Sequence, residues 1–132
     1  MRKEIKKPDK VIYPELSYKI VGALFEVHKE MGSGHHEKYY QKATSEELSR
    51  RLIKFQEQVY LPLIYKDKVV GRLYIDFLIE NKIILEIKKG ENFSKKHIDQ
   101  VMSYLKNKNC KLAILANFSK DGVRYKRIIN FS

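Results

Sequence analysis

Two strand-like runs in the centre of the sequence strongly limit the folds that the chain can adopt. Residues 74–79 and 83–88 are rich in β-branched and apolar side chains, and the polar tripeptide 80–82 separates them. Such a pattern predicts two antiparallel strands joined by a tight turn. Apolar residues occupy both faces of this hairpin, which is typical of strands that are covered on both sides. We therefore expect a sheet with other elements packed on each face.

Three charged side chains interrupt the apolar hairpin. If the turn centres on Asn81, residues equally distant from it face each other, so Asp76 lies opposite Glu86. Residues two apart in a strand share a face, so Glu86 and Lys88 point the same way. Taken alone, the pattern also fits three solvated side chains on the polar face of an amphipathic hairpin. Because both faces are largely apolar, we expect these charges to be partly buried and to need a partner, such as a metal ion or each other.

Length and composition are those of a globular chain. With 132 residues, 43% of them hydrophobic, the chain is most simply one domain with a real core. It contains no run of about 18 apolar residues, so no membrane span is predicted. Residues 1–7 lack the apolar core of a signal peptide. A lone Cys110 cannot form an internal disulfide, which fits a reducing cytoplasm, so we expect a cytoplasmic protein that does not bind membranes.

The chain is strongly basic. Lysine and arginine outnumber aspartate and glutamate by 27 to 16, which gives a formal net charge of +11. Such an excess favours a polyanionic partner, because neutralising phosphates releases condensed counterions. Charge alone is weak evidence, since many basic proteins never contact nucleic acid. Residues 1–14 are lysine-rich and contain two prolines, and we interpret them as a basic flexible arm before a single domain at residues 15–132.

Helical periodicity marks the segment before the central strands. Apolar residues recur at helical spacing over residues 15–31, and the glycines at 32 and 34 are expected to end this helix. A second helix is predicted at residues 36–53, with Glu37 and Tyr40 on one of its faces. The doublet His35-His36 fits loop or helix-start chemistry better than a metal site, because no cysteine or third histidine lies at ligand spacing nearby.

The other strands follow from alternation and from breaks in it. Strands are predicted at residues 55–65 and 69–79, so that three strands form an antiparallel meander. Pro62 cannot donate a backbone hydrogen bond, which favours an edge position for the first of them. The apolar run 112–116 follows a helix that crosses over the sheet, so we expect it to pair parallel to residues 83–88. Residues 127–130 are candidates for a last strand.

The crossover helix is expected to begin after Ser94, a residue suited to the N-cap. Its predicted apolar stripe consists of Ile98, Val101, Met102 and Leu105. A flank of the helix carries His97, Gln100 and Tyr104. Because Gln100 and Tyr104 are one turn apart, both side chains can reach the same place. The alternative is a Gln–Tyr pair on a solvated flank of the helix.

Together, these motifs resemble the GxxExxY-type proteins, a small branch of the PD-(D/E)XK nuclease superfamily. The heptapeptide Gly34-His35-His36-Glu37-Lys38-Tyr39-Tyr40 matches the motif that gives the branch its name. Ile75-Asp76 and Glu86-Ile87-Lys88 match the superfamily core, with isoleucine in place of the usual proline. Residues 100–104 match the QxxxY element of RecB-like members. The resemblance covers residues 15–130 and implies a restriction-endonuclease-like α/β fold, with a mixed sheet of an antiparallel meander plus a parallel strand, flanked by helices.

The resemblance also implies metal-dependent hydrolysis of a nucleic acid, with DNA the expected substrate. Breaking a phosphodiester bond needs a metal ion that stabilises charge on the phosphate and lowers the pKa of the attacking water. Oxygen ligands suit Mg²⁺, and Mn²⁺ is able to substitute. By this resemblance, the catalytic residues are Glu37, Asp76, Glu86, Lys88, Gln100 and Tyr104.

Each of these residues receives a role from the resemblance. Asp76, Glu86 and the backbone carbonyl of Ile87 would hold the metal, and Glu37 would complete or support its shell. Lys88 would orient the water or help to deprotonate it. Gln100 and Tyr104 would position the metal shell, the lysine or the nucleic-acid backbone. A further set of side chains flanks the same end and would contact phosphates, although ordinary surface cations are an equal alternative: Lys89, Lys95, Lys96 and His97.

Two other classes of function remain open. The chain could be a non-catalytic nucleic-acid-binding module that keeps the nuclease fold, or a module that docks a protein partner. The presence of Asp76, Glu86 and Lys88 argues against the first, because a degenerate site usually loses one of them. The sequence does not reveal the form of the substrate or the mode of cleavage. It leaves a homodimer open, since a lone small nuclease domain can cut only one strand at a time.

Overall fold

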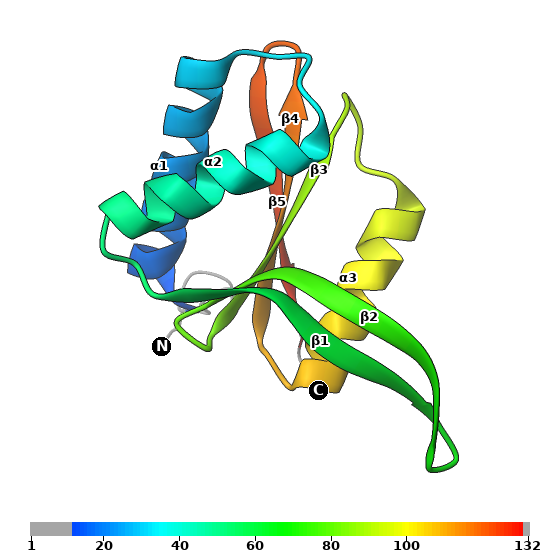
Figure 1. Cartoon of the computed structure of the whole chain (residues 1–132). Coiled ribbons are helices and arrows are strands. Elements are labelled where there is room, and N and C mark those ends of the chain that lie inside the picture. Colours follow the sequence, from blue (N-terminus) through cyan, green and yellow to red (C-terminus); the bar gives the residue numbers. More distant parts are fainter. Residues whose placement is uncertain (1–11, 131–132) are drawn as a thin grey trace, which may run out of the picture.

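The computed structural model describes residues 12–130, which form one mixed five-stranded sheet with helices on both faces (Figure 1). The strands lie in the order β1-β2-β3-β4-β5, with β3 and β4 parallel and all other neighbours antiparallel. The predicted fold class is therefore confirmed. The elements are α1 (Pro14–Met31), α2 (Glu37–Arg50), β1 (Phe55–Tyr65), β2 (Lys68–Ile79), β3 (Ile83–Lys89), α3 (Lys95–Lys108), β4 (Leu112–Ser119) and β5 (Gly122–Ile129).

Some element bounds differ from those expected. Helix α2 ends at Arg50 rather than near residue 53, because Leu52 adopts a left-handed conformation with φ 60° that a helix cannot continue. Strand β4 runs on to Ser119, and β5 begins at Gly122 rather than at residue 127, so that the two form a full hairpin. Most of the basic segment proposed at residues 1–14 lies outside the described residues, and α1 begins at Pro14.

The central hairpin has the register that its sequence predicts. Ile79 pairs with Ile83, and Phe77 pairs with Leu85, so the turn centres on Asn81. Glu80 and Asn81 both have positive φ, of 54° and 57°, and the N–H of Lys82 donates to the carbonyl of Ile79 over 2.9 Å. Two consecutive residues with positive φ are typical of the tight turns that join antiparallel strands.

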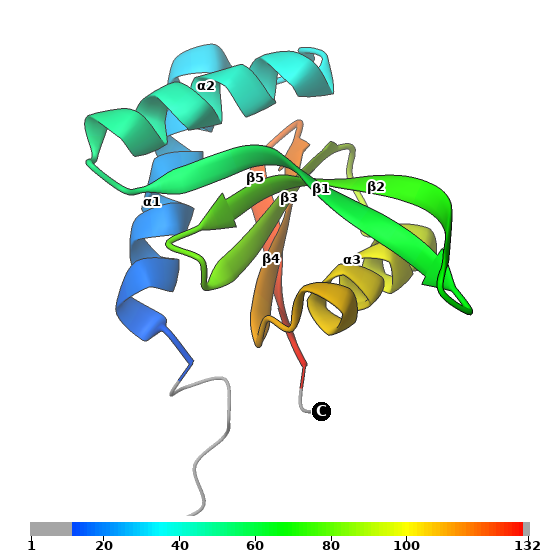
Figure 2. The ribbon, with the colours of Figure 1, turned by 60° about the horizontal axis from the view of Figure 1, so that its bottom comes forward.

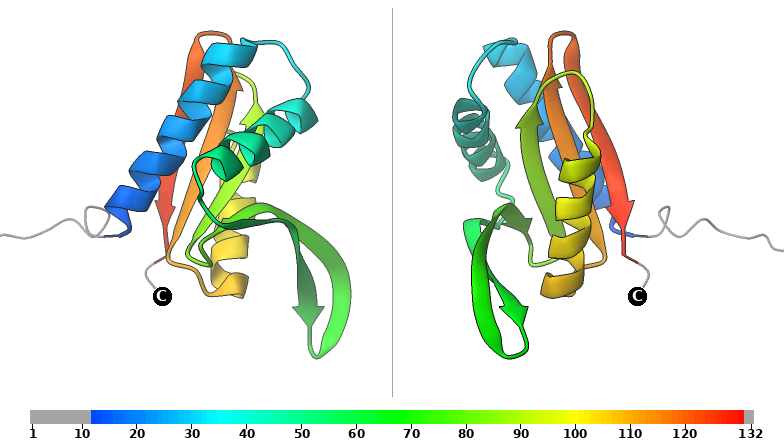
Figure 3. Two further views of the ribbon diagram at one scale, coloured as in Figure 1. Left: turned by 60° about the vertical axis from the view of Figure 1, so that its left-hand side comes forward. Right: turned by 90° about the vertical axis from the view of Figure 1, so that its right-hand side faces the viewer.

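Each face of the sheet has its own core. Helices α1 and α2 cover one face, and α3 covers the other, as Figure 2 and the two views of Figure 3 show. Alternate residues of the central strands supply the two cores, as the apolar sequence on both strand faces predicts. On the α1–α2 side, the strand residues are Phe77, Ile79, Ile83, Leu85, Ile87, Leu112, Ile114, Ala116 and Phe118. On the α3 side, they are Leu61, Ile75, Leu78, Ile84, Ala113, Leu115 and Ile128.

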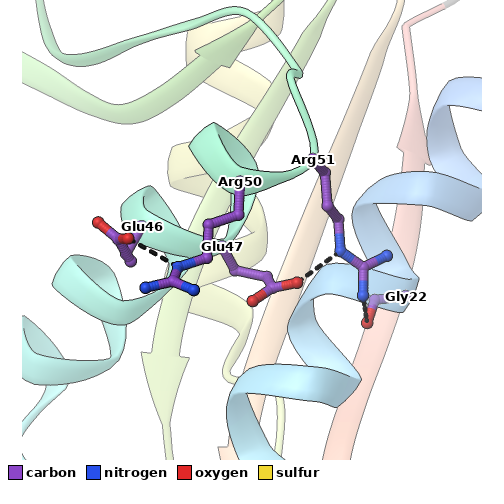
Figure 4. A network of polar contacts seen from close by, with 5 residues as sticks. All are labelled: Gly22, Glu46, Glu47, Arg50 and Arg51. Atoms are coloured by element: carbon purple, nitrogen blue, oxygen red, sulfur yellow. Dashed lines mark hydrogen bonds and ion pairs between the residues drawn. The ribbon is translucent and has the colours of Figure 1, made fainter.

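Polar contacts join α2 to α1 at its C-terminal end (Figure 4). Arg51 forms an ion pair with Glu47 at 2.7 Å and donates to the carbonyl of Gly22 in α1 over 3.4 Å. A Cβ at position 22 would lie 3.1 Å from the Arg51 guanidinium, so glycine leaves room for this approach. The neighbouring Arg50–Glu46 pair is exposed and contributes little to stability.

Strands β1 and β2 extend beyond the rest of the sheet. Strand β2 pairs with β3 only over Phe77–Ile79, whereas it pairs with β1 from Lys68 onwards. Residues 59–75 therefore form a two-stranded ribbon, called the arm below. Figures 1 and 3 show the arm curving away from the sheet past α3. As predicted, β1 is an edge strand. No helix in residues 12–130 has the length and apolar character needed to cross a membrane.

Candidate active site

Asp76 and Glu86 meet where the backbone pairing between β2 and β3 stops. The N–H of Asp76 donates to Glu86 Oε2 over 2.6 Å, and the N–H of Ile87 donates to Asp76 Oδ2 over 2.9 Å. The two carboxylates thus replace the backbone hydrogen bonds that the separating strands lose. Both side chains are buried, with Asp76 8% and Glu86 2% exposed. The sequence-based expectation that they face each other and are buried agrees with this geometry.

Burial shifts the ionisation of both acids. The pKa of Glu86 is raised to about 8, first by burial and then by the negative charge of Asp76. Burial also raises the pKa of Asp76, against the opposing effects of the Ile87 hydrogen bond and the Lys88 charge. Two carboxylates in one buried place repel each other unless a proton or a cation intervenes. As a donor set, two hard oxygen ligands fit a divalent cation such as Mg²⁺.

Lys88 forms an ion pair with Glu86. Its Nζ lies 3.9 Å from Glu86 Oε1, and its side chain is 17% exposed. The strand repeat that the sequence predicted puts it on the same face as Glu86. In the parallel ladder, Lys88 pairs with Asn117 of β4, a residue that is 1% exposed. The Asn117 amide nitrogen donates to the Asn92 carbonyl over 2.8 Å, and its Oδ1 accepts no hydrogen bond from the described residues.

Glu37 is brought towards the acids by the loop before α2. Gly34 has φ 88°, a conformation that favours glycine. Tyr40 holds this loop from within α2, because its hydroxyl donates to the Gly32 carbonyl over 2.7 Å and accepts from the His35 N–H over 3.3 Å. Its ring stacks on Phe118, with 4.2 Å between centroids. The spacing of glycine, glutamate and tyrosine therefore fixes the loop that carries Glu37 at the first position of the helix.

The charge of Glu37 acts on both acids without joining them in a cluster. It raises the pKa of Asp76 and that of Glu86, although burial is the larger cause for each. Residues 12–130 contain no group of three or more His, Cys, Asp or Glu side chains placed to hold a metal ion. Each of Asp76 and Glu86 accepts a backbone N–H from the other's strand, whereas Glu37 acts on both through its charge.

Helix α3 is rotated relative to the stripe that the sequence predicts. Met102 is 41% exposed, whereas Tyr104 is 3% exposed and packs among the core residues of its face. The prediction for Met102 was wrong, and Tyr104 is not on a solvated flank. Its hydroxyl donates to the Tyr74 carbonyl in β2 over 3.4 Å. Burial, followed by the charges of Glu86 and Asp76, raises the pKa of Tyr104 to about 12, so it remains protonated as a donor.

The remaining predicted residues lie on or beside α3 and at the end of β3. Gln100 is half-buried. His97 is also half-buried; burial and the charge of Lys88 lower its pKa, and its Nδ1 has no partner among the described residues. Lys89 and Lys96 are exposed. Lys95 is exposed as well, but it forms an ion pair with Asp99 at 2.8 Å, which compensates its charge.

Two residues near the acids were not foreseen from the sequence. The side chain of Gln58 in β1 donates a hydrogen bond that lowers the pKa of Asp76. Gln58 has φ 48° and interrupts the β1–β2 ladder beside Asp76, and no sequence signal marks a left-handed residue inside a strand. The second is Asn117. A polar residue that extends the apolar run 112–116 was a usable signal, because a buried amide needs partners.

Comparisons with known proteins give one family. A model of the PD-(D/E)XK nuclease superfamily matches residues 14–128. The crystal structure of SSO0001 is similar with a TM-score of 0.49 at 15% sequence identity, over 88% of this chain and 78% of that chain. No curated protein matches the chain.

Proposed function

The chain belongs to the PD-(D/E)XK nuclease superfamily, and from this premise we propose that it is a Mg²⁺-dependent nuclease that hydrolyses phosphodiester bonds, with DNA as its expected substrate. Members of the superfamily are generally nucleases that use divalent metal ions. The observation that carries the proposal is the buried pair of Asp76 and Glu86 beside Lys88. Burying two like charges side by side destabilises the folded state. A divalent cation bound between them offsets this repulsion and stabilises the fold.

Asp76 and Glu86 would hold the metal with the carboxylate oxygens that the backbone does not already fix. Asp76 Oδ2 and Glu86 Oε2 accept backbone N–H groups, which leaves one oxygen of each side chain for the ion. The backbone carbonyl of Ile87 would be a further ligand, and Glu37 would support the shell from outside, at the distance at which its charge still acts on both acids. A bound Mg²⁺ or Mn²⁺ would supply charge stabilisation at the scissile phosphate.

Lys88 would act on the water and on the phosphate. Its ammonium group lies beside Glu86 and is partly exposed, so it can donate a hydrogen bond to the attacking water or offset charge on the phosphate oxygens. Tyr104 would act as a positioning residue, because its hydroxyl holds the β2 backbone at Tyr74, two residues before Asp76. Gln100 would position the metal shell or the nucleic-acid backbone from the same helix.

We assign the chain to the GxxExxY branch because its motif has a physical role in the loop before α2. Gly34 provides the left-handed turn, Tyr40 anchors the loop, and Glu37 is presented at the start of the helix. The phosphate contacts would come from Lys89, Lys96 and His97, which flank the acids. Lys95 is the weakest member of the predicted phosphate-binding set, because its ion pair with Asp99 compensates its charge.

The test is cleavage of plasmid, linear, single-stranded and branched DNA, and of RNA, with Mg²⁺, with Mn²⁺ and with EDTA. We expect metal-dependent cleavage that Asp76→Asn and Glu86→Gln each lower by at least about a hundredfold, because each removes a charged metal ligand. Glu46→Gln is the matched control, since Glu46 is an exposed carboxylate whose ion pair is with Arg50 on α2. Full activity in either site variant, with folding verified by its melting curve, would contradict the proposal. Cleavage that persists in EDTA would contradict the metal requirement.

A further inference from the structure

The arm presents two faces with different surroundings. Cross-strand partners share a face, and residues two apart along a strand share it as well. Val59, Leu61, Leu73 and Ile75 turn towards α3 and pack with its core residues. On the opposite face, Tyr60 pairs with Tyr74, and Pro62 pairs with Arg72. These four residues are called the tyrosine face below.

The tyrosine face exposes aromatic rings next to a cation. Tyr60 is 44% and Tyr74 is 46% exposed, and their ring centroids are 5.7 Å apart. The Arg72 guanidinium lies 5.9 Å from the centre of the Tyr60 ring. Exposed aromatic rings with an arginine alongside are the components that stack on bases and neutralise phosphates in proteins that bind single strands.

The tyrosine face ends close to the proposed metal ligands. Tyr74 is two residues before Asp76 in β2, so the end of the tyrosine face lies about 7 Å along the strand from the acid. The Tyr104 hydroxyl of α3 donates to the Tyr74 backbone carbonyl over 3.4 Å, which helps to hold this part of β2 in place. A nucleic-acid strand lying along the tyrosine face would therefore end close to the acid pair.

We propose that the tyrosine face of the arm binds an unpaired nucleic-acid strand by stacking bases on Tyr60 and Tyr74, and guides it to the proposed active site. The proposal rests on the nuclease function above and names its substrate class, a single strand or a duplex with an unpaired end. Bases inside a duplex are stacked on one another, so their faces are closed to side chains, whereas unpaired bases offer them. The rings on this face can therefore distinguish the two forms.

The experiment compares a labelled single strand with the blunt duplex of the same sequence. Binding is measured by fluorescence anisotropy in EDTA, and kcat and KM are measured with Mg²⁺. The test variant is Tyr60→Ala/Tyr74→Ala, and Tyr60→Trp/Tyr74→Trp keeps aromatic rings. Tyr18→Ala is the matched control, because Tyr18 is an 81% exposed tyrosine on α1, across the sheet from α3. Melting curves verify the folding of each variant.

We expect the double alanine variant to weaken single-strand binding by at least about tenfold, because stacking on one ring contributes about 1–3 kcal/mol. KM for the single strand should rise in parallel while kcat changes by less than about threefold, since the acids are untouched. The tryptophan variant and Tyr18→Ala should bind the single strand about as well as the wild type. Binding of the duplex should change by less than about threefold.

Failure of this proposal and failure of the nuclease proposal give different results. Cleavage by the wild type, with single-strand binding unchanged in the double alanine variant, would overturn the stacking role and leave the nuclease standing. Single-strand binding that the variant loses, without any cleavage by the wild type, would support the stacking role and overturn the nuclease. Equal losses for single strand and duplex would overturn the assigned substrate class. Unchanged binding together with a shift from dimer to monomer, measured by light scattering, would reassign the face to a second copy of the chain.

Discussion

Glu86 is the residue at which folding and ionisation oppose each other most directly. Its carboxyl group titrates near 4.5 in an exposed setting and at about 8 in the folded protein, where it is buried against Asp76. Between these two pH values, the native state holds a proton that the unfolded chain releases. Stability therefore falls as the pH rises through this window, by up to about 1.4 kcal/mol per pH unit for one such group. Asp76, whose pKa is also raised, acts in the same direction.

Replacing Glu86 with glutamine should remove most of this dependence. In EDTA, the unfolding free energy of the wild type should decrease between about pH 5 and pH 8, whereas that of Glu86→Gln should decrease much less, because the amide carries no charge. The glutamine oxygen can still accept the Asp76 N–H that Glu86 accepts now. Urea denaturation at several pH values measures both proteins, and Glu46→Gln, at an exposed site, should follow the wild type. Parallel pH profiles for wild type and Glu86→Gln would show that this carboxyl is not the group responsible.

At the residue scale, some contacts of the site could be read from the sequence and others could not. The approach of Asp76 to Glu86 follows from a turn centred on Asn81, and the observed register has that centre. The residues that contact the two acids were harder to predict from the sequence. Gln58 reaches Asp76 from a left-handed position inside β1, and local sequence gives no reason for such a conformation in a strand. Long-range geometry, rather than propensity, determines that contact.

At the level of the elements, the loop between α1 and α2 is held in place by one residue of the motif, Tyr40. Tyr40 contributes a ring that stacks on Phe118 and a hydroxyl that binds two backbone groups of the loop. The ring belongs to the core, and the hydroxyl belongs to the loop. The two contributions can be separated, because phenylalanine keeps the first and lacks the second.

Tyr40→Phe should loosen the loop more than it destabilises the fold. Loss of the two hydrogen bonds should lower the free energy of unfolding by about 1–2 kcal/mol, since a partly buried carbonyl at Gly32 loses its donor. Amide hydrogen exchange over residues 32–37 should accelerate, while exchange in β3 and β4 should change only as far as global stability does. Tyr39→Phe, at a 44% exposed tyrosine one position earlier, is the control. Unchanged exchange in the loop would contradict the anchoring role of the hydroxyl.

In helix α3, the spacing of apolar residues does not determine which side of the helix faces the core. Its sequence permits a stripe that includes Met102 or one that includes Tyr104, because the two positions flank the same central residues Val101 and Leu105. The arm decides between them. Leu61 and the backbone of Tyr74, both in the arm, contact the side of α3 that carries Tyr104. The Tyr104 hydroxyl can donate a hydrogen bond to the Tyr74 carbonyl there, and a methionine side chain has no group that could do so. The position of the arm was not predictable from the helix itself.

For the molecule as a whole, the strand order follows from simple rules of connection. Adjacent strands in the sequence are adjacent in the sheet, and the one parallel pair spans the one crossover helix, α3. The β1-β2-β3 meander and the parallel β3–β4 pair were predicted, because short connections favour antiparallel neighbours and a crossover allows a parallel one. The position of β5 beside β4 was not predicted. The projection of the arm was not predicted, since the separation of β1 and β2 from the sheet depends on the twist of the ribbon.

The net charge of +11 should make nucleic-acid binding strongly dependent on salt. Replacing Lys89 and Lys96 together with glutamine should reduce the slope of log affinity against log salt by about 1.4 for a single strand, because each phosphate contact contributes about 0.7. Lys19→Gln, on the exposed side of α1, is the control and should leave the slope unchanged. Anisotropy titrations at several salt concentrations measure these slopes. An unchanged slope in the double variant would remove both lysines from the proposed interface.

The edge position of the arm has a practical consequence. Its tip exposes Leu63, Ile64, Val69 and Val70 beside an outer strand that has no partner in the described sheet. Pro62 and the left-handed Gln58 break the row of outward backbone groups, which hinders the addition of another strand. The positive charge adds mutual repulsion between copies, and salt screens that repulsion. Concentrated stocks of the pure protein should therefore remain monodisperse longest at low ionic strength. High-salt washes that remove nucleic acid during purification should be brief and carried out at low protein concentration.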